Sequence, residues 1–200
     1  MTAQQLSHWQ KLAFAPRLRD ARAEDAERLA ALHVDCWRET YAGLIDPQIL
    51  AGLSIGNRAA SWARQIDNLP SSGRILLIEA GGDLIGFGAV GAQRNGPLGR
   101  QGYDGEISAI YLRAAWQGLG LGRRLFAALA ASLVDRGFRS VSLWVLADNR
   151  PAVGFYRHLG GAPLDLPGPA PSVGGAPEIA LGWRDLATFP FETSMKDARI

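Results

Sequence analysis

The chain has 200 residues, of which 48% are hydrophobic and 20% are charged, and its formal net charge is +2. This composition and length are typical of one soluble globular domain with a substantial core. No basic run is long enough to indicate nucleic-acid binding, and no apolar stretch of about twenty residues is available to span a bilayer. Because Cys36 is the only cysteine, no intrachain disulfide forms. Without a secretory signal pattern at the N-terminus, we expect a cytoplasmic protein with no membrane partner.

Apolar periodicity predicts a mixture of strands and helices that follows an N-terminal extension, residues 1–15. The expected strands are 16–20, 74–80, 84–93, 105–112, 140–146 and 178–183, and the expected helices are 23–40, 46–53, 57–68, 121–136 and 150–159. Residues 94–102 read as a glycine-rich connection. This order predicts a single α/β (α+β) domain over residues 16–185, with antiparallel hairpins early and a crossover later, and a C-terminal tail, 186–200.

The segment from Pro163 to Pro177 holds five prolines and three glycines. This composition disfavours a helix or a central strand and predicts a long mobile loop. Two readings stay open, because the loop is either a passive connector or a flap over a binding site.

The run Gln117-Gly118-Leu119-Gly120-Leu121-Gly122-Arg123-Arg124 lies between a predicted strand and a predicted helix. A glycine turn that opens a helix is an anion cradle, because free backbone N–H groups and the helix dipole favour negative charge there. Two arginines lie in the first helical turn, where a positive charge interacts unfavourably with the helix dipole. A bound anion nearby would explain this placement. The spacing differs from the dinucleotide fingerprint and from the P-loop, and a pyrophosphate held by backbone amides is the expected ligand.

The pattern Gln117-x-x-Gly120-x-Gly122 resembles the acyl-CoA pyrophosphate loop of the GNAT (Gcn5-related N-acetyltransferase) superfamily. Two flanking stretches strengthen the resemblance: Glu106-Ile-x-x-Ile-Tyr-Leu112 before the loop, and Asn149-x-x-Ala-x-x-Phe-Tyr156-x-x-x-Gly160 after it. The resemblance implies a twisted, mixed and mostly antiparallel sheet flanked by helices. In that fold two neighbouring parallel strands, here 106–112 and 140–146, splay apart, and acyl-CoA lies in the opening.

The resemblance also implies which residues hold acetyl-CoA as co-substrate. Backbone groups of Ile110 and Leu112 are expected to pair with the pantetheine arm as an added strand, and the N–H of Ile110 is expected to polarise the thioester carbonyl. The full set of expected cofactor-binding residues is Ile110, Tyr111, Leu112, Gln117, Gly118, Leu119, Gly120, Leu121, Gly122, Arg123, Asn149 and Tyr156. Asn149 is also placed to cap the helix that follows it. For Arg124, a nucleotide contact and a solvated side chain stay equally open.

The implied reaction acetylates a primary amine, which must lose a proton to attack, so a base is needed directly or through water. Glu106 is the candidate base, since several members of the superfamily carry a catalytic glutamate at this point. Strand alternation places Glu106, Ser108, Ile110 and Leu112 on one face. The competing reading of Glu106 is a structural ion pair with an arginine. Tyr156 is the candidate general acid for the leaving thiolate. The alternative is that Tyr156 is a half-buried aromatic residue with a satisfied hydroxyl. Other members place a glutamate on the next strand, where this chain has Trp144.

Trp37 and Tyr41 lie four residues apart on one predicted helix face and are the candidates for the wall of an acceptor site, by cation–π contact. Core packing is the commoner explanation for such a pair. The three histidines, His8, His33 and His158, are not spaced as metal ligands, so no metal is expected. The expected acceptor is a small-molecule amine or a protein amino group, no nucleic acid is expected to bind, and a homodimer is compatible with the family.

Three functions from different classes therefore compete. The first is an acetyl-CoA-dependent N-acetyltransferase, in which the amine attacks the thioester directly. The second is a non-catalytic acyl-CoA-binding or sensor module, which would keep the phosphate loop without a working base. The third is a nucleotide- or NAD-binding domain, which the glycine spacing disfavours.

Overall fold

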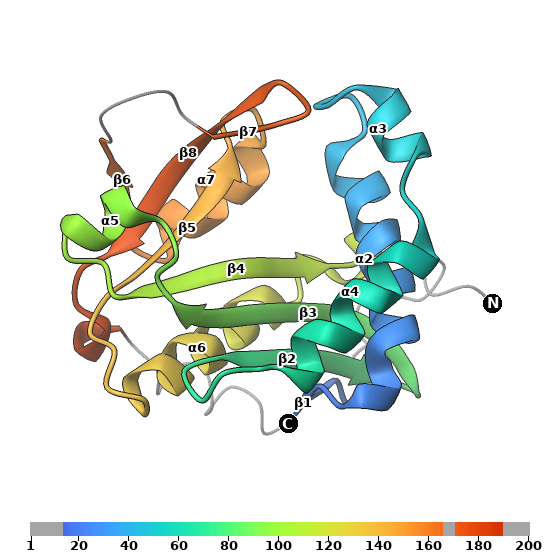
Figure 1. The fold of residues 1–200 in the computed structure, drawn as a ribbon, viewed down its shortest axis with the longest axis horizontal. Helices are drawn as coiled ribbons and strands as arrows, with labels where there is room; N and C mark the ends of the chain where they lie inside the picture. The colour runs from blue at the N-terminus through green and yellow to red at the C-terminus, as the bar shows by residue number, and fades with distance from the viewer. Residues whose placement is uncertain (1–13, 166–170, 190–200) are drawn as a thin grey trace.

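The computed structural model describes residues 14–165 and 171–189 (Figure 1). The predicted extension 1–15 lies almost entirely outside the described residues, and so does the tail from residue 190. The strands are β1 (Arg17–Asp20), β2 (Arg74–Ala80), β3 (Asp83–Ala92), β4 (Gly105–Leu112), β5 (Val141–Leu146), β6 (Ala162–Leu164), β7 (Ser172–Val173) and β8 (Ala176–Trp183). The helices are α2 (Ala26–Tyr41), α3 (Pro47–Ala51), α4 (Ile55–Asp67), α5 (Gly96–Arg100), α6 (Leu121–Val134) and α7 (Arg150–His158).

The strands form one mixed sheet in the order β1-β2-β3-β4-β5-β8-β6, and the short strand β7 pairs with β8. All neighbours are antiparallel except β4 and β5, which are parallel. Helices α2 and α4 cover one face of the sheet, and α6 lies behind the other face (Figure 1). The predicted fold class, a mixed and mostly antiparallel sheet flanked by helices, is therefore confirmed.

Short polar residues set the helix starts that the sequence predicted. Asp46 accepts a hydrogen bond from the Gln48 N–H at 2.8 Å, and Pro47 occupies the first helical turn of α3. Ser54 accepts from the Asn57 N–H at 3.2 Å and begins α4. A side-chain acceptor satisfies an N–H that has no partner inside the helix. The break between the two helices therefore falls where the sequence places its caps.

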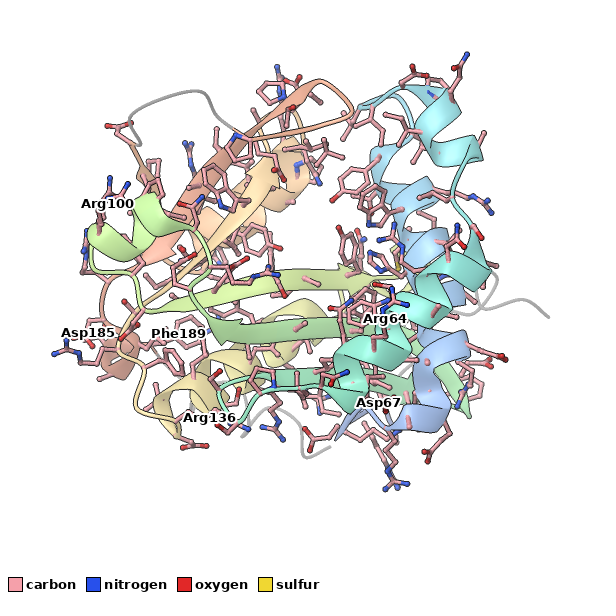
Figure 2. The ribbon with its side chains drawn as sticks, viewed as in Figure 1. Arg64, Asp67, Arg100, Arg136, Asp185 and Phe189 are labelled. Carbon is pink, nitrogen blue, oxygen red and sulfur yellow. The ribbon has the colours of Figure 1, made fainter. Side chains whose placement is uncertain are left out.

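Two hydrophobic clusters fill the two sides of the sheet. One lies between the sheet and α6 and α7, and includes Leu125, Phe126 and Leu181, each with no exposed surface. Leu186 and Phe189 also pack into this cluster, from within the predicted tail. The other lies under α2 and α4. Figure 2 shows charged side chains such as Arg100 and Asp185 at the edge of the molecule, whereas the two clusters and the helices over them cover both faces of the sheet.

Two predictions about connections need correction. The glycine-rich connection 94–102 contains the short helix α5, which Asn95 caps by accepting from the Leu98 N–H at 3.1 Å. The predicted mobile loop from Pro163 to Pro177 is not a loop throughout, because it holds β6, β7 and the start of β8. Strand β6 ends the sheet order, and proline is tolerated on an edge strand. Gly174 and Gly175, with φ of 57° and 81°, turn the β7–β8 hairpin, since two positive φ values suit a two-residue turn.

Candidate active site

The parallel strands β4 and β5 separate soon after they begin. They pair only at Gly105 with Val141 and at Glu106 with Ser142. Beyond these pairs the strands line a pocket of about 790 Å³, which also extends to the start of α6 and to α2. The splayed strands predicted from the sequence are thus present, and the edge of β4 toward β5 is open to an added strand.

One end of the pocket is the N-terminus of α6. Gly120 caps this helix with a φ of 76°, and Gly118 before it has a φ of 74°. Such backbone is the left-handed region that favours glycine. The N–H groups of the first helical residues have no carbonyl to bind inside the helix. Neither Arg123 nor Arg124 forms an ion pair with any residue that the structure describes. These features fit a phosphate-bearing ligand.

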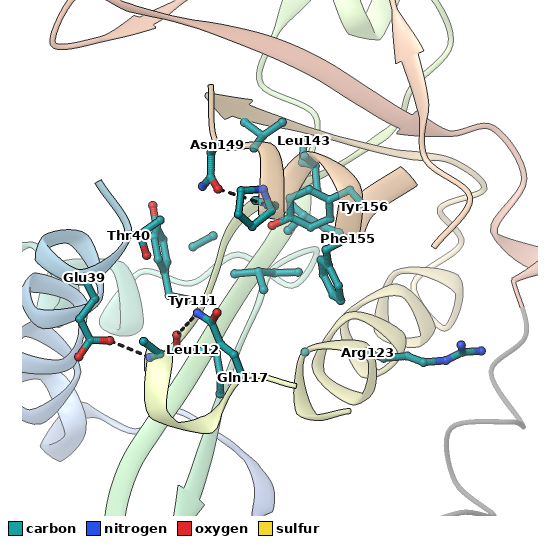
Figure 3. A pocket seen from close by; sticks show the side chains of 18 of the residues that line it. Glu39, Thr40, Tyr111, Leu112, Gln117, Arg123, Leu143, Asn149, Phe155 and Tyr156 are labelled. Atoms are coloured by element: carbon teal, nitrogen blue, oxygen red, sulfur yellow. Dashed lines mark hydrogen bonds between the residues drawn. The ribbon is translucent and has the colours of Figure 1, made fainter. Parts of the chain in front are cut away.

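The pocket gathers most of the predicted cofactor-binding residues (Figure 3). Its lining includes Ile110, Tyr111, Leu112, Gln117, Gly118, Gly120, Gly122, Arg123, Asn149 and Tyr156. Leu121 is instead buried in the core, and Leu119 is partly buried against that core, so neither residue lines the pocket. The Gln117 amide donates to the Leu112 carbonyl at 3.1 Å.

Helix α7 forms a second wall of the pocket. Asn149 caps it, accepting from the Ala152 N–H at 3.2 Å, which confirms the predicted cap. Phe155 and Tyr156 follow on the side of the pocket that faces α6 (Figure 3). A Cβ added at Gly122 would lie 3.3 Å from the Phe155 ring, so glycine at this position lets α6 approach α7 closely. Burial raises the pKa of the Tyr156 hydroxyl well above its usual value, and the hydroxyl stays protonated at neutral pH.

The predicted arrangement of β4 side chains is wrong because the strand contains a bulge. Ala89 of β3 pairs with Ala109, whereas the next residue, Val90, pairs with Ile107. Ser108 is therefore an extra residue, and an extra residue exchanges the faces on its two sides. Ile107 and Ile110 both pack on the α6 side, while Ala109 packs on the α2 side. Glu106 consequently shares a face with Tyr111 and not with Ile110 or Leu112.

Glu106 is buried and held by Arg94. The Arg94 guanidinium donates to both carboxylate oxygens, at 2.6 and 3.1 Å, and the Arg94 backbone N–H adds a third bond at 3.1 Å. The Arg94 side chain itself is 72% exposed. The ion pair considered for this glutamate is therefore present, and Glu106 is not among the residues that line the pocket. Any contact between Glu106 and a substrate would need a bridging water.

Aromatic residues surround the other end of the pocket. Tyr41 of α2 and Tyr111 of β4 share a hydrogen bond of 2.9 Å between their hydroxyl oxygens, and both line the pocket. Trp37 packs edge-on behind Tyr41, with ring centroids 5.1 Å apart, and is not part of the lining. Of the two predicted substrate-binding residues, the structure thus brings Tyr41 to the pocket and places Trp37 as its support.

Several lining residues were not singled out from the sequence as ligand contacts. They are Glu39, Thr40, Ile107, Ser108, Ala109, Ala114, Leu143, Trp144, Val145, Pro151, Ala152, Phe155 and His158. Glu39 is already engaged, accepting from the Ala114 N–H at 2.8 Å and pairing with Arg113 at 3.1 Å. Among the described residues, no group of histidine, cysteine or acidic side chains is arranged to hold a metal ion. None of the described helices has the length and apolar character that a bilayer span requires.

A splayed pair of parallel strands, an open strand edge and a glycine-capped helix together define an acyl-CoA-type transferase site. Residues 26–160 match the model of the acetyltransferase (GNAT) family. The uncharacterized N-acetyltransferase YuaI of Bacillus subtilis is 33% identical over 85% of this chain and 94% of its own length. A probable N-acetyltransferase of Mycobacterium tuberculosis is 31% identical over 70% of this chain and 76% of its own. The chain therefore belongs to the GNAT family and is an N-acetyltransferase.

Solved structures show the same fold. The PaiA N-acetyltransferase of Thermoplasma acidophilum, in complex with coenzyme A, superposes with a TM-score of 0.66 at 19% identity and covers 84% of this chain and 98% of its own. YncA of Salmonella typhimurium, with its cofactor acetyl-CoA, gives a TM-score of 0.61 at 18% identity and covers 85% and 94%. The cofactors belong to those two proteins, and the likeness to this chain is one of fold.

Proposed function

We propose that this protein transfers the acetyl group of acetyl-CoA to a primary amine of a small molecule or protein, by direct attack of the amine on the thioester. The observation that carries the proposal is the single pocket that joins the glycine-capped start of α6, the opening between β4 and β5, and the Tyr41–Tyr111 pair. Acetyl-CoA supplies an activated acetyl group with a thiolate as its leaving group. The backbone N–H groups at Gly120–Arg123 bind its pyrophosphate, and the open edge of β4 pairs with its amide-bearing arm.

Calorimetric titration with acetyl-CoA, followed by assays of thiol release with a panel of primary amines, tests this function. One-site binding and amine-dependent thiol release support it. Binding without turnover on any amine would favour the non-catalytic acyl-CoA module instead, and no binding of acetyl-CoA or CoA would remove the argument from the glycine turn.

In this proposal the Tyr156 hydroxyl interacts with the sulfur of the leaving thiolate. Since its pKa is raised by burial and a thiol titrates near 8.5, complete proton transfer to the thiolate is unfavourable. The Tyr156 hydroxyl therefore stabilises the leaving group mainly by donating a hydrogen bond to the sulfur as negative charge develops on it. Tyr156→Phe is expected to lower kcat by roughly ten- to a hundredfold, the value of one hydrogen bond to a charged group. Steady-state kinetics measure this, and unchanged kcat would show that the hydroxyl serves only packing.

Glu106 is the proposed base, acting through a water, because its face of β4 is also that of Tyr111. Its hydrogen bonds to Arg94 fix the position of the carboxylate. Glu106→Gln is expected to lower kcat by roughly a hundredfold, the scale of a lost general base, with little change in acetyl-CoA affinity. The pH profile of kcat provides the check: a profile that is unchanged in height and shape would remove Glu106 from the mechanism.

A further inference from the structure

Glu178, in β8, is a half-buried carboxylate to which no described residue offers an ion pair or a side-chain hydrogen bond. Burial raises the pKa of this carboxyl. The acidic side chains nearer the strand opening differ, because Glu106 is paired with Arg94 and Glu39 with Arg113. A charge taken partly out of water without a partner costs free energy. A cation supplied from outside the chain would offset that cost.

The register of β8 decides where Glu178 faces. Glu178 lies opposite Leu146, and Ala180 lies opposite Trp144. The alternate residues Ile179 and Leu181 pack into the cluster on the α6 and α7 side. Glu178 therefore faces the other side of the sheet, as does Trp144, which lines the active-site pocket.

Two observations connect Glu178 to the acceptor end of the pocket. Burial raises the pKa of the Tyr41 hydroxyl, and the negative charge of Glu178 raises it further. The β7–β8 hairpin also packs against the α2–α3 region, since a Cβ added at Gly174 would meet the side chains of Ile49 and Ile45. Figure 1 shows this hairpin reaching toward α3. Glu178 thus lies where β8 leaves the hairpin, on the face of the sheet that carries Trp144, outside the residues that line the pocket but within the electrostatic reach of Tyr41.

We propose that Glu178 binds a positively charged group of the acceptor that is distinct from the nitrogen receiving the acetyl group, so that short diamines are preferred acceptors. The thioester position lies in the opening between β4 and β5, and β8 is one strand spacing, about 4.8 Å, beyond β5. The second ammonium of a diamine would lie between Glu178 and the ring of Tyr41, where cation–π attraction adds to the ion pair. This inference rests on the proposed function and names the class of its acceptor.

The test compares diaminobutane, with its two amines at the ends of the chain, and pentylamine, in which a methyl group replaces one ammonium. The wild-type protein is expected to show a kcat/KM at least about tenfold higher for the diamine, which corresponds to about 1.4 kcal/mol. Glu178→Gln keeps the shape of the side chain and removes its charge. It is expected to lose about tenfold in kcat/KM for the diamine, through KM, and to keep the wild-type value for pentylamine.

Two controls make the outcomes distinct. Glu24→Gln removes an exposed carboxylate elsewhere and is expected to match the wild type, and an unchanged acetyl-CoA titration shows that Glu178→Gln is folded. Equal losses for both amines, or no loss for either, would overturn the role of Glu178 while leaving the acetyltransferase intact. An absence of turnover by the wild-type protein on every amine would instead overturn the proposed function, and this inference with it.

Discussion

Valine in place of Gly120 is expected to weaken acetyl-CoA binding by roughly ten- to a hundredfold, as measured by calorimetric titration. Gly120 caps α6 with a φ of 76°, a conformation that a β-branched residue adopts only with strain. Relief of that strain turns the peptide units before α6, and their N–H groups no longer converge on one point. The branched side chain would also project into space that is open in the structure, since an added Cβ meets no described atom within 4 Å.

Gly137, three residues beyond the end of the same helix, provides the matched control. Its φ is 85°, and a Cβ added there likewise meets no described atom within 4 Å. Gly137→Val therefore carries a similar backbone cost, about 1–2 kcal/mol in the free energy of unfolding, at a place remote from the pocket. We expect both variants to lose stability and only Gly120→Val to lose affinity. Equal affinities would mean that the glycine turn has a structural role alone.

The half of the pocket at the start of α6, where we propose that the cofactor binds, was predictable because it depends on local backbone. The glycine turn, the helix start and the Asn149 cap are each set by residues within a few positions of one another, and each occurs as predicted. The strands and long helices follow from apolar periodicity for the same reason. Their ends differ from the predicted ones by two or three residues at most, as for α6, which ends at Val134.

The other half, where we propose that the acceptor binds, depends on contacts that a single sequence does not reveal. The bulge at Ser108 is a property of the pairing between β3 and β4, and no local pattern in β4 indicates it. Arg94 and Glu106 are twelve positions apart in the sequence. They meet because the chain turns back after β3 to form the antiparallel strand β4. The β7–β8 hairpin had a readable signal, the Gly174-Gly175 turn, but the five prolines around it outweighed that signal in the prediction.

Acid is expected to destabilise this protein through His33, well above the pH at which its carboxylates are protonated. His33 lies among the rings of Trp37, Trp62, Phe87 and Tyr111, with centroid distances of 5.0–5.9 Å. Its Nδ1 accepts a hydrogen bond from Trp62 Nε1 at 3.1 Å. Burial, and to a smaller extent the charge of Arg58, lower the pKa of His33 from 6.5 to about 3. The imidazole is therefore neutral in the folded protein.

The direction of the effect follows from where the protons bind. Between pH 6.5 and about 3 the unfolded chain protonates this histidine and the folded chain does not, so stability falls as the pH falls through that window. The carboxylates with lowered pKa values, among them Asp25 and Asp104, lose their contribution only as the pH falls below their ordinary value, 3.8. Glu178, with a raised pKa, acts in the opposite direction, and its half-exposed position makes that contribution smaller.

The window from pH 7 to pH 5 therefore isolates His33. At about 1.4 kcal/mol for each pKa unit, the free energy of unfolding is expected to be about 2 kcal/mol lower at pH 5 than at pH 7. Urea unfolding at both values measures this difference. His33→Asn keeps an acceptor for Trp62 and removes the titration, so its difference is expected to be near zero, whereas His158→Asn, at an exposed position, is expected to keep the wild-type difference. If His33→Asn showed the same pH dependence as the wild type, another group would be responsible for the acid sensitivity. His33 would then contribute only packing beneath Tyr111.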